Sequence, residues 1–161
     1  MLQFFDPAAS YTHERYKLFW IDCKGQPIAN VLRDLDYLKF PTLNVGKELS
    51  PYIQERITSK YLHLDIQEYI KKLITERAAT WREGKTPSVA IFNLGVLFEP
   101  DLRLDPSRII RELSREIGVV ILWEAFVEQN ELFHWGDRSK EFYLNFNDTN
   151  ILKVDLQHEV Q

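Results

Sequence analysis

Three stretches of this chain are apolar at every position for four or five consecutive residues, namely 18–21, 89–92 and 119–123. A strand that is exposed on one face alternates apolar and polar residues, whereas a strand covered on both faces has no such alternation. We therefore expect three buried strands, of the kind found mainly in parallel sheets with helices on both sides.

Helix patterns separate these strands. One apolar stripe with i, i+3, i+4 and i+7 spacing consists of Ile28, Val31, Leu32 and Leu35. After a further strand over 42–45, we expect helices that begin at Ser50–Pro51, at Asp65 and at Asp105–Pro106, the last two ending near Gly84 and Gly118. Strands that alternate with helices predict right-handed crossovers and a three-layer α/β fold, with a mostly parallel sheet of about five strands flanked by helices.

The chain length predicts one domain. With 161 residues, of which 45% are hydrophobic, the chain can bury one core without disulfides or metals. We divide residues 1–161 into a leader (1–14), an α/β core (16–124) and an aromatic-rich C-terminal extension (125–161). Residues 151–156 alternate in hydrophobicity, which predicts an extra strand at the edge of the sheet.

Composition argues against several classes of function. A net charge of −4 disfavours general nucleic-acid affinity, so we expect DNA contact to be weak or indirect. The single cysteine and four histidines have no metal-ligand spacing, so no metal or cofactor is expected. The first ten residues lack the pattern of a signal peptide, and no apolar run approaches the roughly 20 residues of a membrane span. We expect a cytoplasmic protein without a membrane partner.

Ligands of open α/β sheets bind beyond the carboxyl ends of the strands. The first strand-to-helix loop is therefore the place to search for a site. A loop that binds nucleotide phosphates has the pattern G-x-x-x-x-G-K-S/T, because glycines turn backbone N–H groups toward the anion, the lysine contacts the terminal phosphates and the hydroxyl binds magnesium.

Several short motifs after the strands resemble one known family. They are Asn44-Val45-Gly46-Lys47-Glu48-Leu49-Ser50, Leu97-Phe98-Glu99-Pro100, Leu104-Asp105-Pro106, and a strand that ends in Trp123. Over roughly residues 16–124, this layout resembles the BrxF family, the small P-loop proteins of the BREX bacteriophage-defence systems. The resemblance implies a P-loop NTPase-like fold and a role in prokaryotic antiviral defence.

The resemblance also places the eight positions of the nucleotide loop on Asp22, Cys23, Lys24, Gly25, Gln26, Pro27, Ile28 and Ala29. The two glycine positions are occupied by Asp22, which repels phosphate, and by Pro27, which has no N–H to donate. Ile28 replaces the lysine, and Ala29 has no hydroxyl for a metal. The Walker B aspartate falls on Phe92 or Asn93. We interpret both regions as vestigial and assign no catalytic residue.

Other residues have two interpretations. Lys24 and Gly25 have the position of an anion cradle at a helix start, although a plain surface turn is the interpretation that we favour. The arginines Arg108, Arg111 and Arg115 alternate with glutamates, as on a solvated helix face, but they also suit a protein partner or a nucleic-acid backbone. The aromatic residues Phe133 and Trp135 are further possible contacts with a partner.

These observations lead to one functional hypothesis and two alternatives. We expect a non-catalytic adaptor, derived from a P-loop protein, that binds other defence-system proteins in a complex against bacteriophages; assembly into homo-oligomers is left open. The first alternative is a divergent NTPase that obtains its missing cation from a partner subunit. The second is a DNA-binding accessory module, which the acidic composition disfavours.

Overall fold

Five parallel strands form the central sheet of the computed structural model, which describes residues 2–3, 15–82, 84–129, 131–136 and 142–158. They are β2 (Leu18–Asp22), β3 (Thr42–Asn44), β4 (Ser88–Phe92), β5 (Gly118–Trp123) and β9 (Leu152–Lys153). Their order across the sheet is β3-β4-β5-β2-β9. All neighbouring pairs are parallel, as the apolar runs predict.

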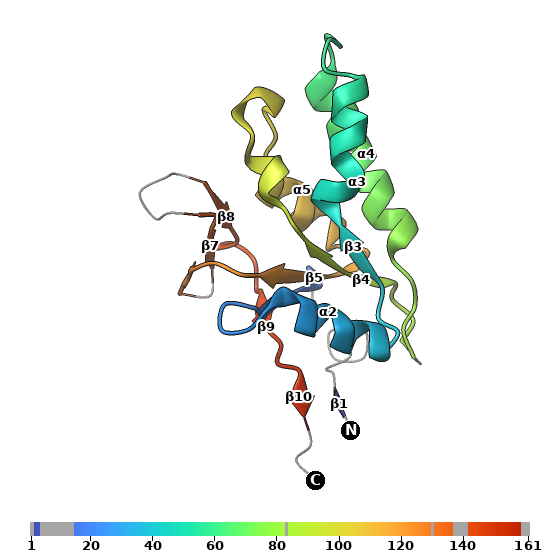
Figure 1. Ribbon diagram of the computed structural model, residues 1–161, viewed down its shortest axis with the longest axis vertical. Helices are drawn as coiled ribbons and strands as arrows, with labels where there is room; N and C mark the ends of the chain where they lie inside the picture. The colour runs from blue at the N-terminus through green and yellow to red at the C-terminus, as the bar shows by residue number, and fades with distance from the viewer. Residues whose placement is uncertain (1, 4–14, 83, 130, 137–141, 159–161) are drawn as a thin grey trace.

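Helices cover both faces of this sheet (Figure 1). On one face lies α2 (Ile28–Tyr37), and on the other lie α3 (Val45–Glu55), α4 (Leu62–Arg77) and α5 (Pro106–Leu113). Alternate residues of β2 belong to two separate core clusters: Phe19 belongs to the cluster that contains α2 residues, while Trp20 belongs to the cluster that contains residues of α3, α4 and α5. The three-layer α/β prediction is therefore confirmed. Among the described helices, none is both long and apolar enough to cross a membrane.

Two helices begin earlier than the sequence predicts. The α3 helix starts at Val45 rather than at Ser50, because the Asn44 side chain caps it by accepting a hydrogen bond from the Lys47 amide (3.0 Å). Pro51 consequently lies inside α3. The α4 helix starts three residues before Asp65, at Leu62. In both cases the predicted cap, Ser50 or Asp65, has the residue type of a helix cap but lies inside the helix.

Two helices also end earlier than predicted. The α4 helix ends at Arg77, because Ala78 has an extended backbone and Ala79 forms an antiparallel bridge with Ser88. The α5 helix ends at Leu113, and Gly118 is the first residue of β5 instead of a helix stop. Its cap is as predicted, since the Asp105 side chain accepts a hydrogen bond from the Arg108 amide (3.2 Å).

The C-terminal extension contains more structure than the sequence predicts. The expected edge strand is present but short, and Leu152 pairs with Phe19 of β2. In addition, β6 (Val127–Glu128), β7 (Leu132–His134) and β8 (Tyr143–Asn145) form a separate antiparallel sheet. Between β4 and α5 lie the 3-10 helices η1 (Gly95–Phe98) and η2 (Pro100–Leu102). Near the two ends, β1 (Leu2–Gln3) pairs with β10 (Gln157–His158).

Candidate functional site

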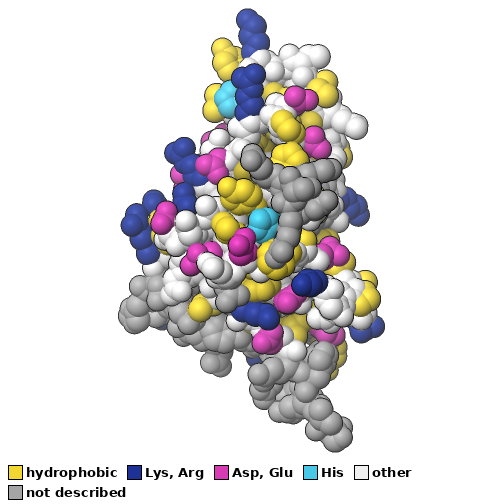
Figure 2. All heavy atoms as spheres, turned by 90° about the vertical axis from the view of Figure 1, so that its left-hand side faces the viewer, with side chains coloured by type: hydrophobic (Ala, Val, Ile, Leu, Met, Phe, Trp, Pro, Cys, Tyr) yellow, Lys and Arg dark blue, Asp and Glu magenta, His cyan; other side chains and the backbone are white. Residues whose placement is uncertain are grey.

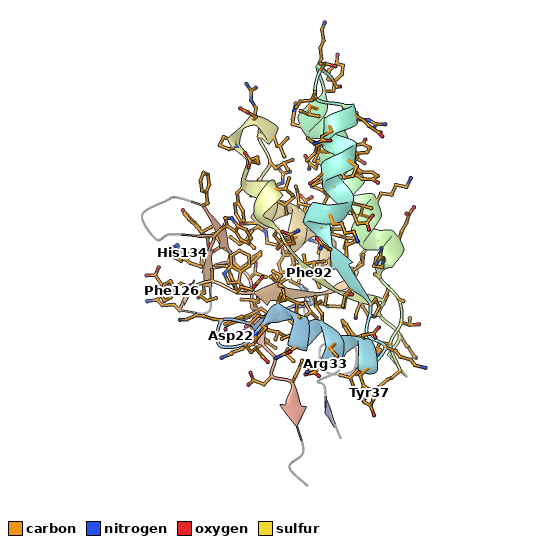
Figure 3. The ribbon with its side chains drawn as sticks, in the orientation of Figure 1. Asp22, Arg33, Tyr37, Phe92, Phe126 and His134 are labelled. Carbon is orange, nitrogen blue, oxygen red and sulfur yellow. The ribbon has the colours of Figure 1, made fainter. Side chains whose placement is uncertain are left out.

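The carboxyl edge of the sheet contains the loop that the sequence singles out. After β2 the chain enters α2 on one face, whereas after β5 it enters the small antiparallel sheet, whose core residues pack with the opposite face. The connections of these neighbouring strands thus diverge, which is where open α/β sheets bind ligands. Figure 3 labels Asp22, Phe92 and Phe126 at this edge.

Backbone amides at the start of the loop are already used within the protein. The Cys23 amide donates to the carbonyl of Trp123 (2.8 Å), and the Lys24 amide donates to Oδ1 of Asp22 (2.9 Å). Pro27, which directly precedes α2, has no amide hydrogen. Because phosphate binding needs several free amides that converge on one anion, this turn is poorly suited to bind phosphate.

Charges around the loop also disfavour a phosphate. The Asp22 carboxylate lies at the end of β2 and faces Nζ of Lys153 (3.8 Å), with both side chains well exposed. The ammonium of Lys24, the one cation in residues 22–29, lies 5.8 Å from the ring centroid of Phe126. On the face seen in Figure 2, acidic and basic side chains intermingle with hydrophobic ones. The loop lacks the concentrated positive charge that a triphosphate requires.

The last positions of the loop serve α2. Ile28 is partly buried and packs on the α2 side of the core, where a phosphate-binding lysine would instead extend toward the ligand. Ala29 is exposed and offers only a methyl group, and Gly25 and Gln26 are exposed in the turn. Residues 22–29 thus have a structural role, because this loop supports the end of β2 and the start of α2.

Cys23 is buried, with 2% of its surface exposed. Burial raises the pKa of its thiol to about 12, and the carboxylates of Glu124 and Asp22 act in the same direction. A thiol of this kind stays protonated at neutral pH and is a poor nucleophile. The structure therefore places Cys23 in the core beside the loop, in a packing role.

We expect the Cys23 thiol to react with a disulfide reagent at pH 8 at least about 100-fold more slowly than glutathione does, because so little of it is thiolate. Absorbance of the released thiolate measures the rate, and the chain unfolded in guanidinium is the control that restores fast reaction. A native rate within about tenfold of that of glutathione would contradict the burial and the raised pKa.

Asn93, one of the two residues on which the resemblance places the Walker B aspartate, connects two strands. It has a left-handed backbone (φ 57°), and its Nδ2 donates to Oδ1 of Asn44 (2.8 Å). Its carbonyl accepts a hydrogen bond from the amide of Gly46 (3.0 Å). Phe92 is partly buried against the α2 side of the core. Neither residue supplies a carboxylate for magnesium; Asn93 instead anchors the start of α3 to the end of β4.

Gly46→Ala should lower the free energy of unfolding by about 1–2 kcal/mol. Its new methyl carbon would lie 2.5 Å from Nδ2 of Asn93, and the cost of overpacking exceeds the helix propensity gained, which is about 1 kcal/mol. Gly25→Ala is the matched control, because nothing lies within 4 Å of its new carbon. Urea unfolding measures both; equal stability of the two variants would refute the Asn93 anchor.

The three predicted contact arginines do not share one environment. Nε of Arg108 is 3.0 Å from Oε1 of Glu112, and this hydrogen bond, together with Lys71, lowers the pKa of the Glu112 carboxyl. Arg111 lines a polar surface pocket of about 400 Å³ between α5 and β8. Arg115 lies beyond the end of α5 and contacts Tyr16. Arg108 is thus paired with a carboxylate, whereas Arg111 and Arg115 form no ion pair within the part of the chain that the structure describes.

The two predicted contact aromatics also differ. Phe133 has no exposed surface, so it packs in the core instead of on a contact surface. Trp135 is partly buried, stacks on Phe98 (ring centroids 6.0 Å apart) and lies close against Gly95. The sequence marks both as apolar but does not show that β7 brings Phe133 inward.

Among the described residues, no cluster of His, Cys, Asp and Glu is arranged to hold a metal ion. His134 pairs with Glu128 across the β6–β7 turn, at 3.2 Å between Nε2 and Oε2.

No protein-family model, curated protein or solved structure matches the chain. The resemblance to the BrxF family therefore stays a prediction that depends on short motifs. The structure places these motifs at the start of α3, in η1 and η2, at the cap of α5 and at the end of β5. All of them lie in or beside connections that follow the carboxyl ends of β3, β4 and β5.

The turn between α3 and α4 was not recognised from the sequence as a surface feature. Ile57 lies in this turn and is 66% exposed. Tyr61 and Leu64 are 63% and 50% exposed. We call residues 56–64 the α3–α4 tip. In sequence its apolar residues resemble the adjacent helix stripes, so no local signal separates them.

Proposed function

We propose that this protein is a non-catalytic adaptor of a prokaryotic complex against bacteriophages, related to the BREX systems, and that it acts by binding another protein. The observation that carries the proposal is the internal use of the Cys23 and Lys24 amides in a loop that also contains Asp22 and Pro27. A loop in this state supports a fold without supporting nucleotide hydrolysis.

The α3–α4 tip is the surface that we assign to the partner. Three large apolar side chains are exposed within its nine residues, and exposed apolar clusters are a mark of protein interfaces. In Figure 1 the α3–α4 hairpin extends well beyond the edge of the sheet, so a partner can surround its end. A concave apolar groove is the complementary shape.

Interactions within the hairpin hold this tip in one conformation. The Tyr61 amide donates to Oγ of Ser59 (3.2 Å), and that hydroxyl lies 3.2 Å from Oδ2 of Asp65. The ring of Tyr52 stacks on Tyr69, with centroids 3.8 Å apart, and joins α3 to α4. Because the turn is already ordered, binding costs less conformational entropy than it would for a flexible loop.

Co-purification with the proteins encoded by neighbouring genes tests this function. We expect the chain to form a stable complex with at least one protein of a defence system. The formation of this complex should not require a nucleotide bound at residues 22–29. Absence of a complex with every neighbouring product would contradict the adaptor role. ATP hydrolysis that appears only on mixing, and is lost when the loop is mutated, would support the divergent NTPase instead.

A further inference from the structure

A cluster of cations surrounds Tyr16, which lies just before β2 at the amino ends of the parallel strands. Residues 22–29 lie at the other end, where the strands have their carboxyl ends. The guanidinium carbons of Arg15 and Arg115 lie 5.3 and 5.6 Å from the centroid of the Tyr16 ring. Nη2 of Arg115 is also 3.5 Å from the Tyr16 hydroxyl. Lys17 joins the group, because its Nζ donates to the carbonyl of Arg115 (2.9 Å).

Arg111 adds a further positive charge. It lies in α5, four residues before Arg115, and the pKa of Tyr16 is lowered by the hydrogen bond from Arg115 and by the charges of Arg15, Arg115 and Arg111. This lowered pKa is what a positive local potential produces. We call Arg15, Tyr16, Lys17, Arg111 and Arg115 the Tyr16 cluster.

The direct contacts that the structure describes for these cations include no carboxylate, although the charge of Glu112 acts on Arg115, and Asp105 and Asp148 line the pocket beside Arg111. The cations contact an aromatic ring, a hydroxyl and a carbonyl, none of which carries a formal negative charge at neutral pH. Among the described residues, no carboxylate forms an ion pair with any of the four cations, whereas Arg108 on the same helix pairs with Glu112. Cations gathered in this way repel one another, and a bound polyanion relieves that repulsion.

We propose that the Tyr16 cluster binds the phosphate backbone of a nucleic acid. Arginine and lysine donate charge-assisted hydrogen bonds to phosphate oxygens, and the stacking on Tyr16 holds two guanidiniums in place beforehand. Of the large apolar side chains that are exposed among the described residues, only Tyr143 lines a pocket with a member of the cluster, Arg111. A positively charged surface without an apolar centre suits a phosphate backbone better than it suits a protein partner.

This surface is separate from the α3–α4 tip and from residues 22–29, so its test is independent of the proposed adaptor role. No group in the cluster is arranged to read base edges in sequence-specific fashion, and we therefore expect binding to depend on salt and not on sequence. With three or four phosphate contacts, the logarithm of the binding constant should fall with the logarithm of salt concentration at a slope of about −2 to −4.

Fluorescence anisotropy of the full chain with labelled single-stranded DNA of about 20 nucleotides, and with the matching duplex, measures this slope. Arg111→Gln and Arg115→Gln should each reduce the magnitude of the slope by about 1 and weaken binding of unrelated sequences equally. Arg108→Gln is the matched control, because that charge is already neutralised by Glu112; it should leave both the slope and the affinity unchanged.

Circular dichroism confirms that each variant is folded before binding is compared. The proposal is overturned if the unmodified chain fails to bind either DNA at low salt, or if Arg108→Gln weakens binding as much as Arg115→Gln does. Equally tight binding of polyglutamate would also overturn it, since that result would indicate an acidic protein surface as the ligand.

Discussion

Phe133→Ala should lower the free energy of unfolding by about 3–5 kcal/mol, the range for truncation of a fully buried aromatic ring. The ring of Phe133 makes edge-to-face contacts with Trp20 and Trp123, at centroid distances of 5.2 and 5.7 Å, and with Phe146 at 5.6 Å. It therefore joins the small antiparallel sheet to the core of the large sheet. Removing it leaves a cavity that these large rings cannot fill.

Urea unfolding followed by tryptophan fluorescence measures this loss. Phe142→Ala is the control, because Phe142 is 36% exposed and its truncation should cost less than about 1 kcal/mol. If Phe133→Ala were as stable as Phe142→Ala, the antiparallel sheet would not be packed as described, and Phe133 would again be available as a contact with a partner.

Ile57→Asp combined with Tyr61→Asp should weaken the complex with the protein partner by at least about 100-fold. Both side chains are among the most exposed large apolar groups of the described residues. The two introduced carboxylates would be buried without a partner in the apolar groove. Truncation of an interface anchor alone already costs about 2 kcal/mol or more of binding free energy. The free energy of unfolding should change by less than about 1 kcal/mol, because neither side chain is packed in the core.

Tyr37→Asp is the matched control for this experiment. Tyr37 is 75% exposed but lies at the end of α2, away from the α3–α4 tip in Figure 3. The Tyr37→Asp variant should bind the partner with the same affinity as the unmodified chain in a calorimetric or surface-based assay. Equal affinity of the tip variant and the Tyr37 variant would show that the partner contacts another surface.

The layers of the fold were predictable because apolar runs report burial directly. Every residue of β5 is buried, and so is every residue of β4 except Phe92, which is partly exposed. Helix boundaries were less predictable, because capping depends on which polar residue meets a free amide. Asn44 and Ser50 are both good caps by type, but the Asn44 side chain accepts from the Lys47 amide, whereas the Ser50 hydroxyl donates to the carbonyl of Gly46 inside the helix.

The site was predictable in position but not in its contacts. The order of strands and helices placed residues 22–29 at the carboxyl edge, whereas the absence of phosphate binding, inferred from Asp22 and Pro27, stays a prediction. The Tyr16 cluster was missed because Arg115 lies 99 positions from Tyr16 in sequence. Such a contact depends on β2 and β5 being neighbours, which a pattern of single residues does not reveal.

Titration calorimetry of the full chain with ATP and magnesium tests the central claim most directly, namely that residues 22–29 do not hold a triphosphate. We predict no saturable heat up to about 1 mM ATP, which corresponds to a binding free energy weaker than about −4 kcal/mol. Saturable, magnesium-dependent binding with a micromolar Kd that is lost in Lys24→Ala would contradict it.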